Sequence, residues 1–159
     1  MKKLLVLTGI LVILIISFIA YTNASIESPF SNQPIKNLQT PTNRIHLDHI
    51  QIQDNKLILT YNKNLYLAEY APTKSMLPLL DKGHNGIEII PETLRDIKIG
   101  DIIAYNSKLT HELIVHRVID IKQDNKGIYF ITKGDNNPNI DQEKVRFSQI
   151  KFVLIGILY

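Results

Sequence analysis

The distribution of apolar and polar residues divides the chain into three parts. Residues 4–21 form an uncharged, mostly apolar run. A helix of this length spans roughly 27 Å, close to the ~30 Å hydrocarbon core of a membrane. Residues 22–43 are rich in Ser, Thr, Asn, Gln and Pro and keep no hydrophobic period. The pattern predicts a cytoplasmic end and membrane anchor over 1–21, a polar linker over 22–43 and a β-rich domain over 44–159.

A cleaved secretory signal is the competing interpretation of the apolar run. The apolar region of such a signal is usually about 7–15 residues long, and Thr22-Asn23-Ala24 is only a fair cleavage site. The length of the run therefore favours a retained, single-pass anchor. Lys2 and Lys3 before the run, with Glu27 after it, favour a cytoplasmic N-terminus and a domain on the extracytoplasmic side of the cell membrane.

Short β-type segments separated by turn residues follow one another after residue 44. Residues 45–52 and 56–61 flank Asp54-Asn55, a turn signal, and predict a hairpin. Residues 92–98 are polar and predict one helical turn. Further strands are predicted at 65–70, 87–90, 102–105, 113–121, 128–132 and 150–159. The fold class indicated is mostly β.

Composition excludes several classes of function. The 159 residues fit one domain with an appendage. The absence of cysteine excludes disulfides, thiol catalysis and cysteine-rich metal sites. The net charge of +3 is spread along the chain, without a basic run carrying interleaved aromatic residues, so nucleic acid is not an expected partner.

A serine lies on a stiff stretch of the domain. Pro72 and Pro78 flank Ser75, and each ring fixes its own φ at about −65° and disfavours helix in the residue before it. Met76 and Leu77 are apolar and are expected to anchor the stretch to a core. A hydroxyl held in this way is a candidate nucleophile if a base reaches it. An ordinary turn serine is the plainer alternative for this stretch by itself.

A histidine on a predicted strand is the candidate base. Alternation over 113–121 places His116 on one face with Ile114 and Val118, so the imidazole is expected to be partly buried. Burial favours the neutral imidazole, which can accept a proton. A core histidine bonded to a backbone carbonyl is the alternative.

The polar loop at 133–141 supplies two acids. Asp135 and Asp141 lie six residues apart, and Gly134 can supply a positive φ. Either acid could orient an imidazole as the third member of a triad, or the loop could be an ordinary surface turn.

Histidines elsewhere do not predict a metal site. His46 and His49 have no third ligand at metal-site spacing. His111 and His116 lie five residues apart, whereas a zincin helix places its histidines four apart. No metal or cofactor is therefore expected.

Four short boxes in a fixed order carry a resemblance to a known family. They are Ser-Met-Leu-Pro at 75–78, Gly-Asp-Ile-Ile-Ala-Tyr at 100–105, Val-His-Arg-Val at 115–118 and Lys-Gly-Asp-Asn-Asn at 133–137. Together they closely resemble the type I signal peptidase family, in the branch found in archaea and the endoplasmic reticulum. His116 stands where the common bacterial branch has a lysine. The resemblance covers residues 70–159.

The resemblance implies a role for each matching residue. Ser75 is the nucleophile, and its backbone N–H with the hydroxyl of Thr73 stabilises the oxyanion. His116 is the general base, Asp141 orients it and Asp135 supports the arrangement. Apolar residues near the nucleophile line pockets for small side chains at the −1 and −3 positions of the substrate: Met76, Leu77 and Val115.

The resemblance also implies a fold and a cellular role. The domain is expected to consist of coiled, partly barrel-like antiparallel sheets, and the protein to cut signal peptides from exported precursors. The expected partners are these precursors, the lipid bilayer and the secretion translocon. A dedicated processing peptidase for one class of surface proteins and a catalytically silent, precursor-binding paralogue stay open as alternatives. Lys74 departs from the small or uncharged residue that usually precedes the nucleophile.

Overall fold

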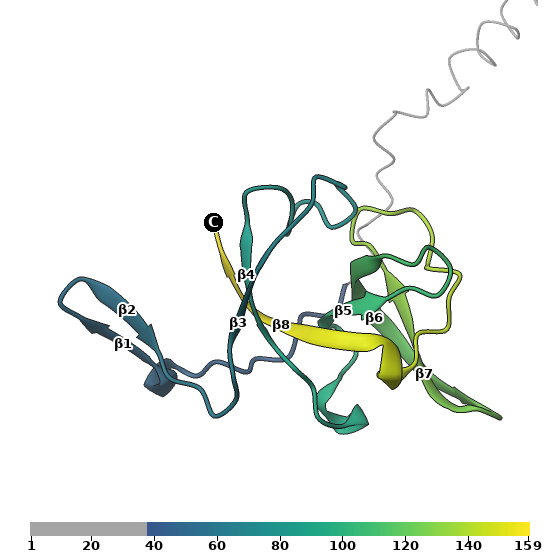
Figure 1. Ribbon diagram of the computed structural model, residues 1–159, viewed down its shortest axis with the longest axis horizontal. Helices are drawn as coiled ribbons and strands as arrows, with labels where there is room; N and C mark the ends of the chain where they lie inside the picture. Colours follow the sequence, from purple (N-terminus) through teal and green to yellow (C-terminus); the bar gives the residue numbers. More distant parts are fainter. Residues whose placement is uncertain (1–37) are drawn as a thin grey trace, which may run out of the picture. The chain divides into compact units, whose positions relative to one another are not determined.

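The computed structural model describes residues 38–159 (Figure 1). The predicted anchor and residues 22–37 of the predicted linker lie outside this range. Within it, no helix combines the length and the apolar composition that crossing a membrane requires.

The predicted N-terminal hairpin is confirmed. Strands β1 (Ile50–Gln53) and β2 (Lys56–Leu59) pair antiparallel, and Asp54 and Asn55 turn the chain with φ values of 50° and 60°. The first strand is shorter than predicted. Residues Leu47–His49 form a 3₁₀ turn, η1, closed by a hydrogen bond from the His49 N–H to the His46 carbonyl at 3.0 Å. This local bond replaces the ladder bonds that the alternating pattern suggested.

The remaining strands form one antiparallel six-stranded sheet in the order β3-β4-β8-β5-β6-β7 (Figure 1). The mostly β, antiparallel class is thereby confirmed. The C-terminal strand β8 lies between β4 and β5, so the two halves of the sheet are joined by the last residues of the chain. The helical turn predicted at 92–98 is also confirmed as the 3₁₀ turn η2, and η3 is a further 3₁₀ turn before β8. The bounds are β3 Tyr66–Glu69, β4 Asn85–Ile89, η2 Leu94–Asp96, β5 Ile102–Asn106, β6 Leu113–Asp124, β7 Gly127–Lys133, η3 Phe147–Gln149 and β8 Ile150–Leu158.

Both faces of the sheet are covered by apolar side chains. On β6, Ile114 packs against one buried cluster and its neighbour Val115 packs against the other. Adjacent residues of this strand, His116 and Arg117, are therefore both buried, at 7% and 5% exposure. The larger cluster contains Ile89, Ile97, Ile103, Tyr105, Val118, Phe130, Val145, Ile150 and Val153, and the smaller contains Met76, Leu80, Ile102 and Leu154.

Residues 38–43 of the predicted linker contact the sheet domain. The Thr42 N–H donates to the buried carboxylate of Asp101 at 2.8 Å, and the Gln39 carbonyl accepts from Arg117 at 3.3 Å. Gly100, with a φ of 98°, has no room for a side chain because the carbonyl of Thr40 lies against it. The backbone of this segment is therefore held by the side chains of Asp101 and Arg117 and by its contact with Gly100.

The β1–β2 hairpin lies apart from the six-stranded sheet (Figure 1). Its cross-strand pairs Ile50–Leu59 and Ile52–Leu57 place four apolar residues on one face. Ile52 is 80% exposed and Leu57 is 64% exposed, so that face is largely open to solvent.

Candidate active site

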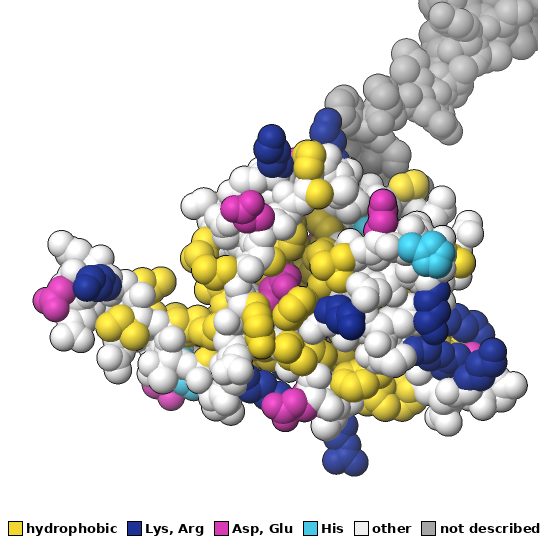
Figure 2. Space-filling view, viewed as in Figure 1, with side chains coloured by type: hydrophobic (Ala, Val, Ile, Leu, Met, Phe, Trp, Pro, Cys, Tyr) yellow, Lys and Arg dark blue, Asp and Glu magenta, His cyan; other side chains and the backbone are white. Residues whose placement is uncertain are grey.

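Ser75 and His116 line one cleft of about 380 Å³. One wall comes from the segment between β3 and Met76, together with Leu80, and the other comes from the start of β6. Figure 2 shows a hollow among apolar side chains on this face of the molecule. The fold thus brings the candidate nucleophile and the candidate base to the same cavity from positions 41 residues apart in the sequence.

His116 is bonded to an acid from the loop after β7. Its Nδ1 lies 2.7 Å from Oδ2 of Asp141. The same oxygen accepts hydrogen bonds from the hydroxyls of Thr132, at 2.6 Å, and Tyr105, at 3.1 Å. Burial raises the pKa of Asp141, but the hydrogen bonds from His116 and Thr132 outweigh it and leave this pKa below its ordinary value. The acid is therefore an anion at neutral pH.

The charge of Asp141 determines the tautomer of the histidine. An ionised carboxylate only accepts hydrogen bonds, so Nδ1 of His116 must carry the proton. The other ring nitrogen, Nε2, is then the atom with a free lone pair. This is the arrangement that a general base requires.

The Ser75 hydroxyl bonds to its neighbour. Its Oγ lies 3.1 Å from Oγ1 of Thr73, and its backbone N–H donates to the same Thr73 oxygen at 3.4 Å. The hydrogen bonds among residues 38–159 include none between Ser75 and His116. Thr73 thus contacts both groups of Ser75 that the resemblance places in the reaction.

The polar loop after β7 fixes the backbone around Ser75. The Asn136 N–H donates to the Ser75 carbonyl at 2.9 Å, and the Asn136 side-chain amide donates to the Lys74 carbonyl at 3.0 Å. Lys74 has a φ of 61°, in the left-handed region that costs a non-glycine residue of order 1–3 kcal/mol. Asn136 therefore stabilises an unfavourable backbone conformation directly before Ser75.

Gly134 is required for space. The φ of Gly134 is not positive, so the structure does not use the positive φ that glycine could supply at this position. A Cβ here would lie 2.7 Å from the Ser75 carbonyl oxygen, closer than Cβ atoms approach.

The Gly134→Ala variant is expected to lose stability. Overpacking of this kind costs about 1–3 kcal/mol, and here it pushes the loop away from Ser75. Gly156→Ala is the matched control, because its nearest contact is a side-chain methyl of Ile87 at 3.3 Å, which can move. Urea unfolding measures both variants; equal losses would contradict the close contact at Ser75.

Asp135 is bonded to Arg117 and not to His116. The guanidinium of Arg117 donates to both carboxylate oxygens, at 2.8 Å and 2.6 Å, and also to the Gly100 carbonyl at 2.8 Å. The two side chains are 6% and 5% exposed. The Asp135 N–H points to the sulfur of Met76 at 3.5 Å. The two acids of the loop thus have different partners: Asp141 bonds to His116, and Asp135 bonds to Arg117.

The candidate substrate-binding residues lie in different places. Met76 and Val115 both line the cleft, and Met76 belongs to the smaller buried cluster. Leu77 is half-buried and is not part of the cleft lining. Tyr70 and Thr132 were not singled out in the sequence. Tyr70 directly follows β3, and Thr132 lies on β7. The sequence predicts both strands, but a single tyrosine or threonine in or beside a strand does not indicate a role.

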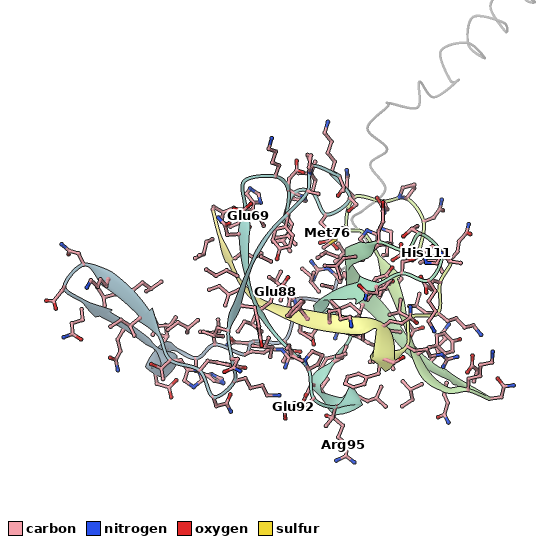
Figure 3. All side chains as sticks on the ribbon, viewed as in Figure 1. Glu69, Met76, Glu88, Glu92, Arg95 and His111 are labelled. Atoms are coloured by element: carbon pink, nitrogen blue, oxygen red, sulfur yellow. The ribbon has the colours of Figure 1, made fainter. Side chains whose placement is uncertain are left out.

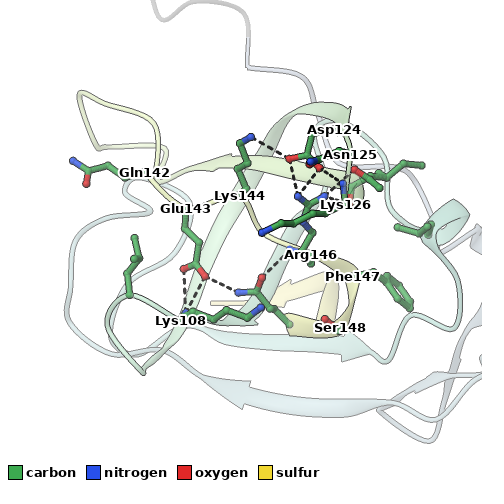
Figure 4. A pocket seen from close by; sticks show the side chains of 15 residues that line it. Lys108, Asp124, Asn125, Lys126, Gln142, Glu143, Lys144, Arg146, Phe147 and Ser148 are labelled. Carbon is green, nitrogen blue, oxygen red and sulfur yellow. Dashed lines mark hydrogen bonds and ion pairs between the residues drawn. The ribbon is translucent and has the colours of Figure 1, made fainter.

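A larger pocket of about 970 Å³ lies away from Ser75 and His116 (Figure 4). In it, Arg146 donates to both oxygens of Asp124 at 2.8 Å, and Glu143 accepts from the Lys108 backbone N–H and from the side-chain amide of Gln149. Both carboxylates of this pocket thus have hydrogen-bond partners, and its lining contains no histidine that could act as the His116 of the cleft does.

The lowered pKa of Asp141 predicts a specific pH dependence of stability. A carboxyl whose folded pKa lies below its unfolded pKa adds stability above the unfolded value, and this stability is lost as the pH falls through the folded value. Wild type should therefore lose unfolding free energy below about pH 4. Asp141→Asn should lose less over the same range, measured by urea unfolding at a series of pH values. Asp48→Asn, at an exposed acid in η1, is the control. Equal slopes for Asp141→Asn and wild type would contradict the ionised state of Asp141.

Comparison with known proteins adds one relative. No family model matches the chain. Over 99 residues the chain is 55% identical to a protein of Methanocaldococcus jannaschii named "Uncharacterized protein MJ0260". The match covers 62% of this chain and 44% of that protein, so the chain spans less than half of the relative's length. The name of this relative states no activity.

Proposed function

We propose that the protein is a membrane-anchored serine endopeptidase of the signal peptidase type, which removes signal peptides from exported precursors. One observation carries the proposal: Ser75 and His116 line the same cleft, and Nδ1 of His116 is held by the anionic Asp141 at 2.7 Å. A serine, an imidazole and a carboxylate that holds the imidazole by one ring nitrogen are the parts that acyl transfer needs.

The reaction follows from these parts. Ser75 Oγ attacks the scissile carbonyl carbon while its proton passes to Nε2 of His116. The imidazolium is stabilised by Asp141 and returns the proton to the leaving amine as the peptide bond breaks. Water then attacks the acyl-enzyme, again through His116, and releases Ser75 with its hydrogen.

The hydroxyl of Ser75 must exchange partners before attack. Ser75 and His116 line the same cleft, so rotation about the Cα–Cβ bond of Ser75 would move its Oγ away from Thr73 and toward His116. The Thr73 hydroxyl would then be free to donate to the oxyanion. Losing one such donor costs on the order of 10²–10³-fold in rate.

The finer features of the fold belong to the same proposal. We propose that the sheet is coiled and partly barrel-like; breaks in register between Ile87 and Glu88, Ala104 and Tyr105, and Val118 and Asp120 support this, because bulges bend strands. The apolar run at 4–21 would hold the domain on the extracytoplasmic face. Enzyme and precursor would then share a surface, which raises their effective concentration.

The proposal is tested by reconstituting the full chain in liposomes with a precursor that has alanine at −1 and −3. We expect one cut after the −1 residue, identified by mass spectrometry, and its loss in the His116→Ala variant because no base remains for Ser75. His111→Ala is the matched control, since His111 is exposed and does not line the cleft. Absence of cleavage by wild type, or equal cleavage by His116→Ala, would overturn the proposal.

A silent, precursor-binding protein is the second candidate. The observation in its favour is that the Ser75 hydroxyl is bonded to Thr73. Such a protein would bind the precursor in the same liposomes without cutting it. A dedicated processing peptidase would instead cut one class of surface proteins and leave the general precursor intact.

A further inference from the structure

Tyr70 lines the cleft but takes part in no step of the proposed reaction. It directly follows β3, lies five residues before Ser75 and lines the cleft together with it. Its ring also packs against the smaller buried cluster, which includes Met76 and Leu154. The cleft therefore borders the smaller buried cluster through the ring of Tyr70 as well as through Met76 and Leu80.

A buried acid holds the phenol of Tyr70. Its hydroxyl donates to Oε1 of Glu88 at 3.3 Å, and Glu88 is 4% exposed on β4. Figure 3 shows Glu88 where β4 crosses β8, in agreement with its pairing to Leu154. Within residues 38–159 no cation pairs with Glu88. Burial raises the pKa of Glu88 and exceeds the lowering effect of the Tyr70 hydrogen bond. The carboxyl thus has the phenol as its partner in place of a counter-ion.

The backbone of β4 fits closely around the same phenol. Gly86 is buried, and a Cβ on it would collide with the Tyr70 hydroxyl and lie 2.8 Å from the ring carbon that carries it. Only glycine leaves room for the ring to lie on the strand at this position. Gly86 and Glu88 lie two residues apart on β4. The contact with Gly86 and the hydrogen bond to Glu88 therefore fix the ring of Tyr70 against one strand.

We propose that Tyr70, held by Glu88 and Gly86, limits the size of the substrate side chain that the cleft accepts. The ring has little room to move, because its hydroxyl end contacts Gly86 and the ring packs against the cluster that contains Leu154. A side chain larger than alanine or valine would have to displace it. Tyr70 thus determines the size of the substrate side chain that binds. The inference rests on the proposed function, which identifies the ligand as an exported precursor.

Peptide binding tests the inference without requiring cleavage. Signal peptides with Ala, Val, Leu or Phe at −1, and a second set varied at −3, are titrated against the full chain carrying Ser75→Ala. We expect Ala to bind about 10–100-fold more tightly than Leu at one of the two positions. Adding Tyr70→Ala should bring this ratio close to one, because the cavity then extends over Gly86.

Two further variants keep the test decisive. Tyr70→Phe retains the ring and should retain the preference, and Tyr70→Leu should relax it partly while filling more of the core than alanine does. Thermal unfolding identifies any variant that fails to fold. An unchanged preference in Tyr70→Ala and Tyr70→Leu, or no size preference in the parent, overturns the inference. If the wild-type chain cuts no precursor but peptide binding depends on side-chain size and on Tyr70, the inference about Tyr70 is upheld and the proposed peptidase activity is overturned.

Discussion

Replacing Ser75 by alanine is expected to reduce precursor cleavage by on the order of 10⁴–10⁶-fold, with little change in stability. The substitution removes the atom that forms the acyl-enzyme in the proposed mechanism. The rest of the cleft, including His116 and its bond to Asp141, stays in place. Ser75 is half-buried and the lost Oγ bonds only to Thr73, so the unfolding free energy should change by no more than about 1 kcal/mol.

The measurement is single-turnover cleavage in liposomes, compared with thermal unfolding of the same preparation. Ser148→Ala is the matched control, because Ser148 is exposed and lies outside the cleft. A residual rate within about tenfold of wild type would exclude Ser75 as the nucleophile.

Replacing Asp135 by alanine is expected to destabilise the domain by about 3–5 kcal/mol. The change leaves the guanidinium of Arg117 buried without its charge partner, at 6% side-chain exposure. Because the backbone around Asp135 also holds the Ser75 segment, cleavage should fall as well. Urea unfolding measures the loss of stability.

A surface pair provides the contrast for Asp135. Asp120 and Lys122 lie 3.3 Å apart and are 42% and 52% exposed, so Asp120→Ala should cost about 0–1 kcal/mol. The double variant Arg117→Met with Asp135→Leu should recover much of the stability lost by Asp135→Ala, since it removes both charges. A loss below about 1 kcal/mol for Asp135→Ala would contradict the buried pair.

Most strands could be predicted from local sequence, and their arrangement in the sheet could not. Alternation marks β6 and β7, and a turn signal marks the β1–β2 hairpin, because these features act between near neighbours. The insertion of β8 between β4 and β5 depends on packing between distant segments, which leaves no local pattern. The 3₁₀ turn at Leu47–His49 likewise follows from one local hydrogen bond that competes with the alternating pattern.

In the candidate site, too, contacts between distant segments could not be predicted from local sequence. The prediction that Asp141 orients His116 and Asp135 supports the arrangement came from the resemblance, and the residues alone left the two acids equivalent. Their difference comes from partners on neighbouring strands: Asp141 meets Thr132 and Tyr105, whereas Asp135 meets Arg117. Tyr70 could not be identified because its importance depends on Gly86 and Glu88, which lie on another strand.

The β1–β2 hairpin bears on how the domain opens. Two strands without a third or a covering helix are at most marginally stable in water, and among residues 38–159 no third strand pairs with these two. Their backbone amides should therefore exchange with deuterium well before those of β5 and β6, which lie within the sheet. A protease added to the folded chain should accordingly make its first cut within the described residues near Asp54, long before the sheet carrying His116 unravels.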